Sequence, residues 1–187
     1  MNQNLFLPQN FFDLTDFPFK DIFNGVNNVN NVWEVIPKIK EYSKEKLLMG
    51  EGSVVAEGAL IREGVILGKN VYIGPRMELK NCIIMNNTLA KHMGYIADSI
   101  IGNDCNISGG TMFANFRLDH KPVTIKKEAQ RIDTGLQKFS AVLGDGTWTG
   151  VNSVLNPGSI LGKNCKIYPL VSVVGYYPAD SLITSTK

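Results

Sequence analysis

The sequence predicts an all-β protein: a parallel β-helix preceded by a short helical extension. Two observations favour this fold. From position 55 to 79 an aliphatic residue recurs at every sixth position, and the step returns at 101 and 107 and between 143 and 173. A step of six is too short for a pair of helices, but it fits a short strand plus a corner, three of which close one triangular coil. Stacked coils then pair as parallel strands about 4.8 Å apart, with the aliphatic side chains pointing inward.

The extension is expected in residues 1–50, which are rich in phenylalanine between positions 6 and 23. An amphipathic helix should follow, because Trp33, Ile36, Ile39 and Tyr42 fall on one helical face. Pro37 would begin or kink that helix, and Gly50 would end it. We expect the extension to cover one end of the β-helix core with aromatic side chains, since a stack of coils needs covered ends.

The β-helix itself is expected at residues 51–176, with a tail at 177–187. Its corners include the tripeptides 68–70 and 162–164, both Gly-Lys-Asn, because Gly and Asn tolerate left-handed backbone angles. The repeat is interrupted twice. The register slips between Leu79 and Ile101, around His92, and the pattern vanishes from Phe113 to Phe139. The second interruption is rich in charge and predicts an excursion loop, either functional or merely solvated.

Composition excludes several classes of function. The net charge of +2 predicts no strong attraction to nucleic acid or to a membrane. Residues 1–10 contain no long apolar stretch, and no run approaches transmembrane length. The three cysteines are unclustered, which argues against disulfides or a zinc site and fits a reducing compartment. We therefore expect a cytoplasmic protein without nucleic-acid or membrane partners.

Residues 91–121 contain both histidines of the chain. His92 is a candidate general base, because an imidazole accepts a proton near neutral pH; the alternative is a structural histidine bonded to the backbone. Arg62 and Lys80 are eighteen residues apart, one full coil, so they should stack on one face. Two stacked cations suit a phosphate group, although solvated surface charges remain an alternative.

A collinear set of polar residues carries a resemblance to a known family: Arg62, Glu78-Leu79-Lys80, His92-Met93-Gly94-Tyr95, Cys105-Asn106-Ile107, Ala114-Asn115-Phe116 and Lys121. The set resembles the acetyltransferase half of the bifunctional N-acetylglucosamine-1-phosphate uridylyltransferase/glucosamine-1-phosphate acetyltransferases. From Ala114 onward the chain is more similar to the archaeal sugar-1-phosphate nucleotidylyltransferase/acetyltransferases, which share an Asn-aliphatic-Arg loop. The bacterial family has Tyr where Phe116 stands.

The resemblance implies a left-handed β-helix and transfer of an acetyl group from acetyl-CoA to an amino-sugar 1-phosphate, without a metal. It implies His92 as the base, and sugar or phosphate contacts from Arg62, Lys80, Tyr95, Asn106, Asn115 and Lys121. It implies acetyl-CoA contacts at Gly144-Asp145 and Tyr168-Pro169, although an extra hexapeptide makes the second assignment less direct. His120 has no counterpart and is taken as a surface residue. The family further implies a homotrimer and a place in UDP-N-acetylglucosamine synthesis. No nucleotidyltransferase motif is found, so a separate nucleotidyltransferase is a candidate partner.

Three other readings compete with this one. The acceptor could be another sugar or nucleotide-linked amino sugar, or the transfer could be to oxygen. The chain could instead be a non-catalytic homologue that binds sugar phosphates or a partner enzyme. A carbonic-anhydrase-like metalloenzyme on the same scaffold is excluded, because it needs three histidines and the chain has two.

Overall fold

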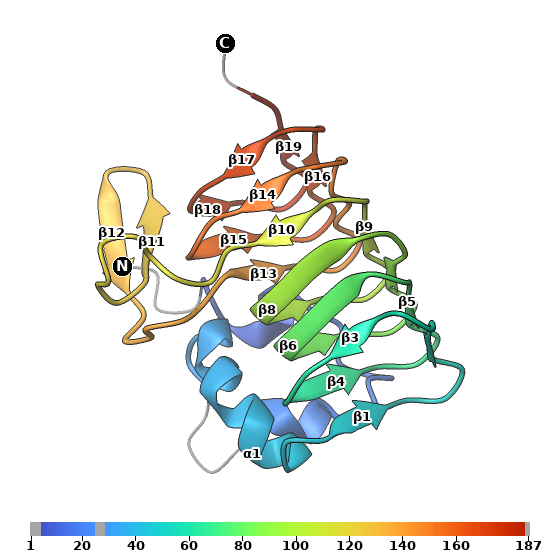
Figure 1. Ribbon diagram of the computed structural model, residues 1–187. Helices are drawn as coiled ribbons and strands as arrows, with labels where there is room; N and C mark the ends of the chain where they lie inside the picture. Colours follow the sequence, from blue (N-terminus) through green and yellow to red (C-terminus); the bar gives the residue numbers. More distant parts are fainter. Residues whose placement is uncertain (1–4, 25–28, 186–187) are drawn as a thin grey trace.

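The computed structural model describes residues 5–24 and 29–185, and the chain folds as a left-handed parallel β-helix with three flat faces (Figure 1). Face 1 contains β3 (Leu60–Ile61), β10 (Met112–Phe113), β14 (Val154–Leu155), β17 (Ser172–Val173) and the first halves of β6 (Met77–Ile84) and β8 (Gly94–Ile101). Face 2 contains β1 (Leu47–Met49), β4 (Val65–Leu67), the second halves of β6 and β8, β13 (Ala141–Leu143), β15 (Ser159–Leu161) and β18 (Tyr176–Tyr177).

Face 3 contains β2 (Val54–Val55), β5 (Tyr72–Ile73), β7 (Leu89–Ala90) and β9 (Asn106–Ile107), and it continues through a bridge at Trp148 to β16 (Lys166–Ile167) and β19 (Leu182–Ile183). All these pairings are parallel, as the hexapeptide repeat predicts. The β-helix extends beyond its expected bounds of 51–176 at both ends, because β1 precedes residue 51 and β19 follows residue 176. The predicted corners are confirmed: Asn70 and Asn164 have φ of 53° and 59°.

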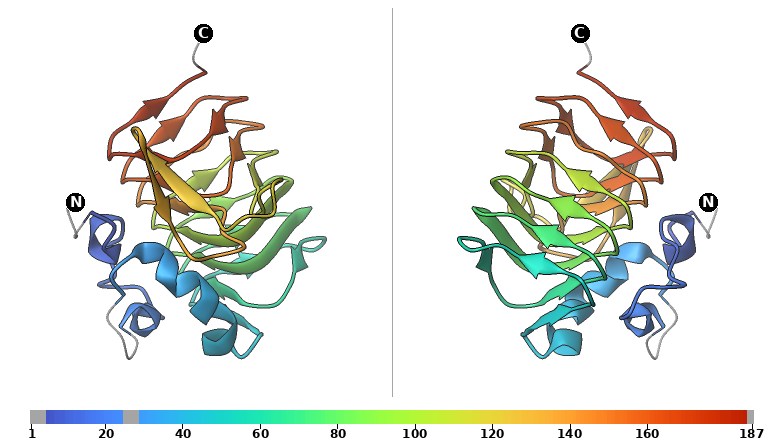
Figure 2. Two further views of the ribbon diagram at one scale, coloured as in Figure 1. Left: turned by 90° about the vertical axis from the view of Figure 1, so that its left-hand side faces the viewer. Right: turned by 90° about the vertical axis from the view of Figure 1, so that its right-hand side faces the viewer.

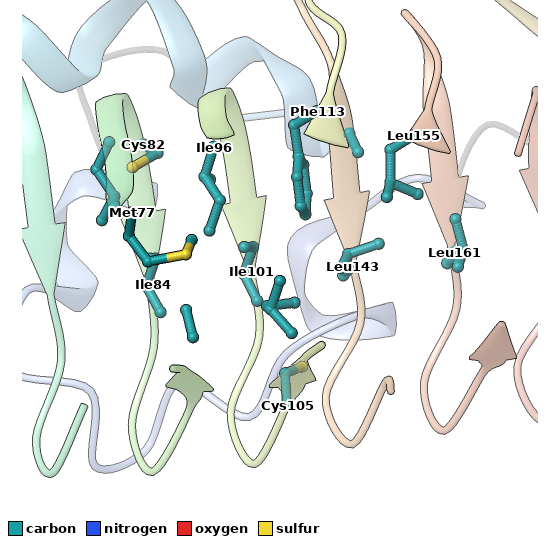
Figure 3. Packing of buried hydrophobic residues seen from close by; sticks show 14 of the residues in the cluster. Met77, Cys82, Ile84, Ile96, Ile101, Cys105, Phe113, Leu143, Leu155 and Leu161 are labelled. Carbon is teal, nitrogen blue, oxygen red and sulfur yellow. The ribbon is translucent and has the colours of Figure 1, made fainter. Parts of the chain in front are cut away.

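The interior of the coils holds the first hydrophobic core. Its members are buried side chains that point inward from the faces, including Ile84, Ile96, Ile101, Phe113 and Leu143 (Figure 3). Cys105 and Cys165 belong to this core, as expected for small inward positions.

The register slip lies at a different place from the one predicted. Inward side chains normally recur every six residues, but Ile84 follows Leu79 after five, and Ile101 follows Ile96 after five. Each of these steps therefore lacks one residue at the corner between faces 1 and 2. The corner residues there are Asn81 and Asp98, with φ of 45° and 46°. The slip therefore is not at His92. A tighter turn lets β6 and β8 run through this corner without a break.

A second hydrophobic core covers the outer side of face 2. Ile66, Ile83, Ile100, Val142 and Ile160 point outward from successive coils and pack against the N-terminal extension. Strands β4, β13 and β15 are consequently buried at every residue, as in sheets covered on both sides. In Figures 1 and 2 the extension, in blue, lies beside the stack of coils. The expectation that it covers one end of the core is wrong, because its aromatic side chains pack on the outward residues of face 2.

The extension is mostly irregular, with 3₁₀ helices η1 (Pro8–Asn10), η2 (Lys20–Phe23) and η3 (Val32–Lys38) before the short α-helix α1 (Ile39–Ser43). Trp33, Ile36 and Ile39 are buried and Tyr42 is half-buried, but Val32 and Val35 are buried as well, so burial is not confined to the predicted helical face. The predicted end at Gly50 is wrong. Lys44 and Glu45 adopt φ of 51° and 60°, which ends the helix at Ser43 and directs the chain into β1.

The excursion from face 1 forms a hairpin, β11 (Thr124–Lys127) and β12 (Gln130–Asp133), before the chain returns at β13. Val123 and Ile125 are fully buried in the second core. The excursion is therefore packed on the β-helix and is more than a solvated loop. None of the helices in residues 5–24 and 29–185 is long and apolar enough to cross a membrane.

Asp145 fastens the extension to the β-helix. Its Oδ2 accepts a hydrogen bond from the Asp13 backbone N–H at 2.7 Å, and its Oδ1 accepts from the backbone N–H and the Nδ2 of Asn103 at 2.8 and 2.9 Å. Its own N–H donates to the Phe11 carbonyl oxygen at 2.9 Å.

We predict that Asp145→Ala lowers the free energy of unfolding by about 2 kcal/mol, because the donors around this carboxylate lose a charged acceptor. Urea denaturation at fixed protein concentration measures the change. Asp16→Ala is the control, since Asp16 is exposed in the same segment, and it should change stability by less than about 0.5 kcal/mol. Equal stabilities of the two variants would contradict the role of Asp145.

Candidate active site

Face 1 carries the candidate residues along its two edges. The edge shared with face 2 is the cationic edge, formed by Arg62, Glu63, Glu78 and Lys80. The edge shared with face 3 is the histidine corner, formed by residues 91–93, 108–111, 149–153 and 168–171 of successive coils. Strands β6 and β8 lead from the histidine corner toward the cationic edge.

The cationic edge begins with a stacked pair of cations. The pairing of Leu60 with Glu78 and of Ile61 with Leu79 places Arg62 beside Lys80 in the next coil, as the eighteen-residue spacing predicts. Arg62 Nη1 donates to Glu78 Oε1 at 3.0 Å, and Lys80 Nζ lies 3.5 Å from Glu63 Oε1.

Ion pairing dominates the electrostatics of this edge. The hydrogen bond to Glu78 raises the pKa of Arg62. A hydrogen bond from its own backbone and another from Lys40 lower the pKa of Glu63 to about 2. Glu63 is therefore charged at neutral pH, and it partly compensates the cations that the sequence analysis proposed for a phosphate.

Tyr95 and Asn115 lie beside this edge. Tyr95 pairs in register with Glu78 of the preceding coil. Partial burial, then the charges of Asp98 and Glu78, raise the pKa of Tyr95, so the phenol keeps its proton as a hydrogen-bond donor. Asn115 Nδ2 donates to Asp98 Oδ2.

Asp98 is a residue that the sequence reasoning missed. It is 5% exposed, and its Oδ1 also accepts a hydrogen bond from Asn81 Nδ2 at 2.7 Å. The carboxylate thus orients the Asn115 amide from the corner where the repeat drops a residue. That irregularity is the signal in the sequence that could have identified it.

His92 stands at the histidine corner, exposed, over an open pocket of about 410 Å³ lined by Tyr72, Pro75, Leu89, Lys91 and His92. Gly109 of the next coil leaves room above it, since a Cβ there would lie 3.3 Å from His92 Cβ. Among the described residues the imidazole has no hydrogen-bond partner. This observation disfavours a structural histidine held by the backbone and leaves both ring nitrogens available to a ligand.

The remaining candidates lie apart from the cationic edge. Asn106 is on face 3, next to Leu89 of the pocket and beside Trp148. Lys121 is exposed on the excursion, where its backbone N–H donates to Asp119 Oδ1 at 3.3 Å. Asp119 is ion-paired with Arg117. His120 is exposed and packs edge-on against Phe116, with ring centroids 5.2 Å apart.

The two predicted acetyl-CoA corners differ in position but not in free backbone donors. At Gly144-Asp145 both backbone N–H groups already donate, to the carbonyl oxygens of Leu161 and Phe11, so neither is free for a cofactor. Tyr168-Pro169 lies on the histidine corner, with Tyr168 54% exposed, but the Tyr168 N–H donates to the Ile183 carbonyl oxygen at 2.8 Å and proline has no N–H. Trp148 was also missed: it is exposed on face 3, with Lys166 Nζ 4.7 Å from its ring centroid.

Known proteins share parts of this chain. The bifunctional protein GlmU of Methanococcus vannielii is 38% identical over 117 residues, which cover 59% of this chain and 28% of that protein. The bifunctional sugar-1-phosphate nucleotidylyltransferase/acetyltransferase of Sulfurisphaera tokodaii is 37% identical over 103 residues, covering 54% of this chain and 26% of that protein. The aligned part thus spans about a quarter of the length of these curated relatives.

Solved structures share the fold. The acetyltransferase domain of PglB from Neisseria gonorrhoeae has a TM-score of 0.55 at 14% identity, covering 74% of this chain and 60% of that chain. AntD, an N-acyltransferase from Bacillus cereus, has a TM-score of 0.52 at 18% identity, covering 74% of this chain and 81% of that chain.

These relatives confirm the resemblance drawn from the collinear polar residues. The family model described as the GMPPB C-terminal domain matches residues 43–177. This match includes every coil from β1 to β18, and the protein belongs to the GMPPB C-terminal domain family.

Proposed function

We propose that this protein is an acetyl-CoA-dependent N-acetyltransferase acting on an amino-sugar 1-phosphate, glucosamine 1-phosphate or galactosamine 1-phosphate. The observation that carries the proposal is the layout of face 1. One edge holds stacked cations and oriented polar groups, and the other holds an imidazole that lies over an open pocket and has no hydrogen-bond partner in residues 5–24 and 29–185. The names of the relatives, which join sugar-1-phosphate chemistry to acetyl transfer, favour the same substrates.

The chemistry assigned to His92 is removal of one proton. The amine nitrogen of the sugar attacks the thioester carbonyl carbon, and the imidazole accepts the proton that nitrogen must lose. Collapse of the tetrahedral intermediate breaks the carbon–sulfur bond, and the departing thiolate takes a proton from the imidazolium. Backbone N–H groups lining the site would stabilise the intermediate's oxyanion.

Transfer is proposed to be direct, without an acyl-enzyme. The chain's three cysteines are all buried. Burial raises the pKa of the Cys105 thiol to about 12, and it also raises the pKa of Cys82 and Cys165. A thiol must ionise to act as a nucleophile, so none of them is suited to carry an acetyl group.

The assay that tests the proposal measures thiol release from acetyl-CoA with glucosamine 1-phosphate, with galactosamine 1-phosphate and with buffer alone. Release that depends on one of the amino-sugar phosphates supports it. Equal rates in all three would leave a non-catalytic sugar-phosphate-binding homologue as the better account. Release with another acceptor only would favour an acetyltransferase of different specificity.

We predict a homotrimer whose active sites lie between subunits. Met93 at one end of face 1 and Asp98 at the other are five residues apart along the strand, roughly 16 Å, whereas the amine and phosphate of the proposed substrate are on adjacent carbons. One chain's His92 would then act with the cationic edge of a second copy. Met93, Val151 and Leu170, all exposed along the histidine corner, offer an apolar contact.

Sedimentation equilibrium at micromolar concentration is expected to give the mass of three chains. Leu170→Asp should shift this mass toward that of one chain, because it places a charge in the contact. Many of the chain's apolar residues are already buried between the extension and face 2, so a high apolar content does not by itself predict a trimer. The prediction therefore depends on the exposed apolar residues of the histidine corner. A wild-type monomer would contradict it.

We predict that Arg62→Ala and Lys80→Ala each raise KM for the sugar phosphate roughly tenfold and leave KM for acetyl-CoA unchanged. Each change removes a cation, and Arg62→Ala also takes away the ion-pair partner of Glu78, whose carboxylate then repels the phosphate. Steady-state kinetics with each substrate varied in turn measures both constants. Lys138→Ala, at an exposed lysine of the excursion, is the control. Unchanged KM in both variants would place the phosphate elsewhere.

A further inference from the structure

Lys40 of α1 joins the N-terminal extension to the cationic edge. Its stem passes over Gly64 at the corner between faces 1 and 2, where a Cβ would lie 2.9 Å from Lys40 Cγ. Because glycine has no side chain, position 64 leaves room for the Lys40 stem. Lys40 lies outside the hexapeptide repeat, so neither spacing nor stacking in the sequence pointed to it.

The ammonium group of Lys40 meets the same carboxylate as the two cations already placed there. Lys40 Nζ donates to Glu63 Oε1 at 3.0 Å, Lys80 Nζ lies 3.5 Å from that same oxygen, and Arg62 Nε lies 3.8 Å from Glu63 Oε2. Lys80 is the least exposed of the three cations, at 17% of its side chain, and Glu63 is 33% exposed. Three positive groups thus converge on one accessible carboxylate.

Three cations, Arg62, Lys80 and Lys40, share two ion-pair partners at this edge, Glu63 and Glu78. The buried Asp98 carboxylate lies at the same corner, but its hydrogen bonds go to Asn81 and Asn115. A phosphate group has more oxygens than a carboxylate and about two negative charges, and it accepts several charge-assisted hydrogen bonds at once. The arrangement resembles a phosphate site in which a carboxylate of the chain holds the cations together.

We propose that Lys40 is a third cation of the phosphate-binding site and that Glu63 occupies the place of the phosphate until the acceptor binds. The inference rests on the proposed function for the identity of the ligand, the phosphoryl group of an amino-sugar 1-phosphate. It gives residues 1–50 a part in substrate recognition, and it makes Glu63 a competitor whose charge lowers the affinity for the acceptor.

The competing account is a purely structural ion pair that fastens α1 to the β-helix. The two accounts predict different changes in phosphate affinity when either charge is removed. If Lys40 and Glu63 only fasten α1, removing either charge changes stability and leaves phosphate affinity alone. If they form a phosphate site, removing the cation weakens binding and removing the carboxylate strengthens it.

The test is isothermal titration of the full chain with glucosamine 1-phosphate and, separately, with inorganic phosphate. Lys40→Met keeps the stem that packs on Gly64 and should weaken binding of both about fivefold, a modest effect because the lysine is partly exposed. Glu63→Gln should tighten both by about the same factor. Lys40→Arg should bind like the wild type. Lys46→Met, at an exposed lysine just after the helix, is the control and should change nothing.

Opposite changes in affinity for Lys40→Met and Glu63→Gln support the proposal. Changes of the same sign, or unchanged affinity in both folded variants, overturn it. The outcome is separable from that of the proposed function. If no amino-sugar phosphate is acetylated but the affinities of the variants for inorganic phosphate change in the predicted directions, the phosphate site is supported and the acetyl-transfer proposal fails. If acetylation occurs but the affinities do not change in the predicted directions, only this inference fails.

Discussion

Replacing His92 with alanine is expected to lower kcat by about 10²–10⁴-fold, the usual contribution of a positioned general base. KM for acetyl-CoA should barely change, because the imidazole is not assigned a cofactor contact. The prediction follows from the geometry at the histidine corner, where the side chain is exposed, lines the open pocket and has no partner among the described residues. Steady-state kinetics of wild type and variant at several pH values measures the effect.

His120→Ala is the matched control for this experiment, because it removes the chain's other histidine from an exposed position on the excursion. Its kcat should stay close to that of the wild type. If His92→Ala retains full kcat with its oligomeric state intact, the base is another group and the assignment of His92 is wrong.

Replacing Phe17 with alanine is expected to lower the free energy of unfolding by about 3–5 kcal/mol, the usual cost of emptying a buried aromatic site. Phe17 is 1% exposed, and its ring centroid lies 5.9 Å from that of Phe19 and 6.4 Å from that of Phe23. These rings belong to the same core as the outward side chains of face 2. The loss should therefore appear in one transition of urea denaturation that includes the β-helix.

Leu118→Ala is the control for stability, because Leu118 lies on the excursion and is 99% exposed. It should change the free energy of unfolding by less than about 0.5 kcal/mol. A loss below about 1 kcal/mol for Phe17→Ala, or a separate early transition, would mean that the extension does not fold together with the coils.

The repeat made the β-helix predictable because one inward position per strand recurs at a fixed step. The same repeat did not locate the register slip. Spacing alone places a shortened coil between Leu79 and Ile101, and the slip was predicted near His92. In the structure the coils are shortened at Asn81 and Asp98, at the corners between faces 1 and 2. A short polar residue that tolerates a positive φ is what such a corner requires.

The cover over face 2 was harder to predict. Segments such as Val65–Leu67 and Ala141–Leu143 are apolar at consecutive positions, which indicates strands buried on both sides. That signal was present in the sequence, but it does not say which segment supplies the cover. The contact of Asp145 with Asp13 and that of Lys40 with Glu63 both join the extension to the β-helix, and they depend on folding that brings together residues more than twenty positions apart.

Spacing predicted where the two cations of the candidate site lie, but not what they contact. Arg62 and Lys80 lie together as a simple coil count requires. No local pattern indicated that Glu63 and Glu78 would pair with these cations. Nor did any local pattern show that the N–H groups at Gly144 and Asp145 would already be engaged, because both features arise from neighbouring coils.

The central claim, transfer of an acetyl group to the amine of a sugar phosphate, is tested most directly by identifying the product. Mass spectrometry of reactions with acetyl-CoA and either glucosamine 1-phosphate or glucose 1-phosphate would show which group is acetylated. The account predicts an N-acetylated sugar phosphate from the amine-bearing substrate, strongly reduced in His92→Ala, and no product from glucose 1-phosphate. Comparable acetylation of glucose 1-phosphate, or no acetylation of any amino-sugar phosphate, would contradict it.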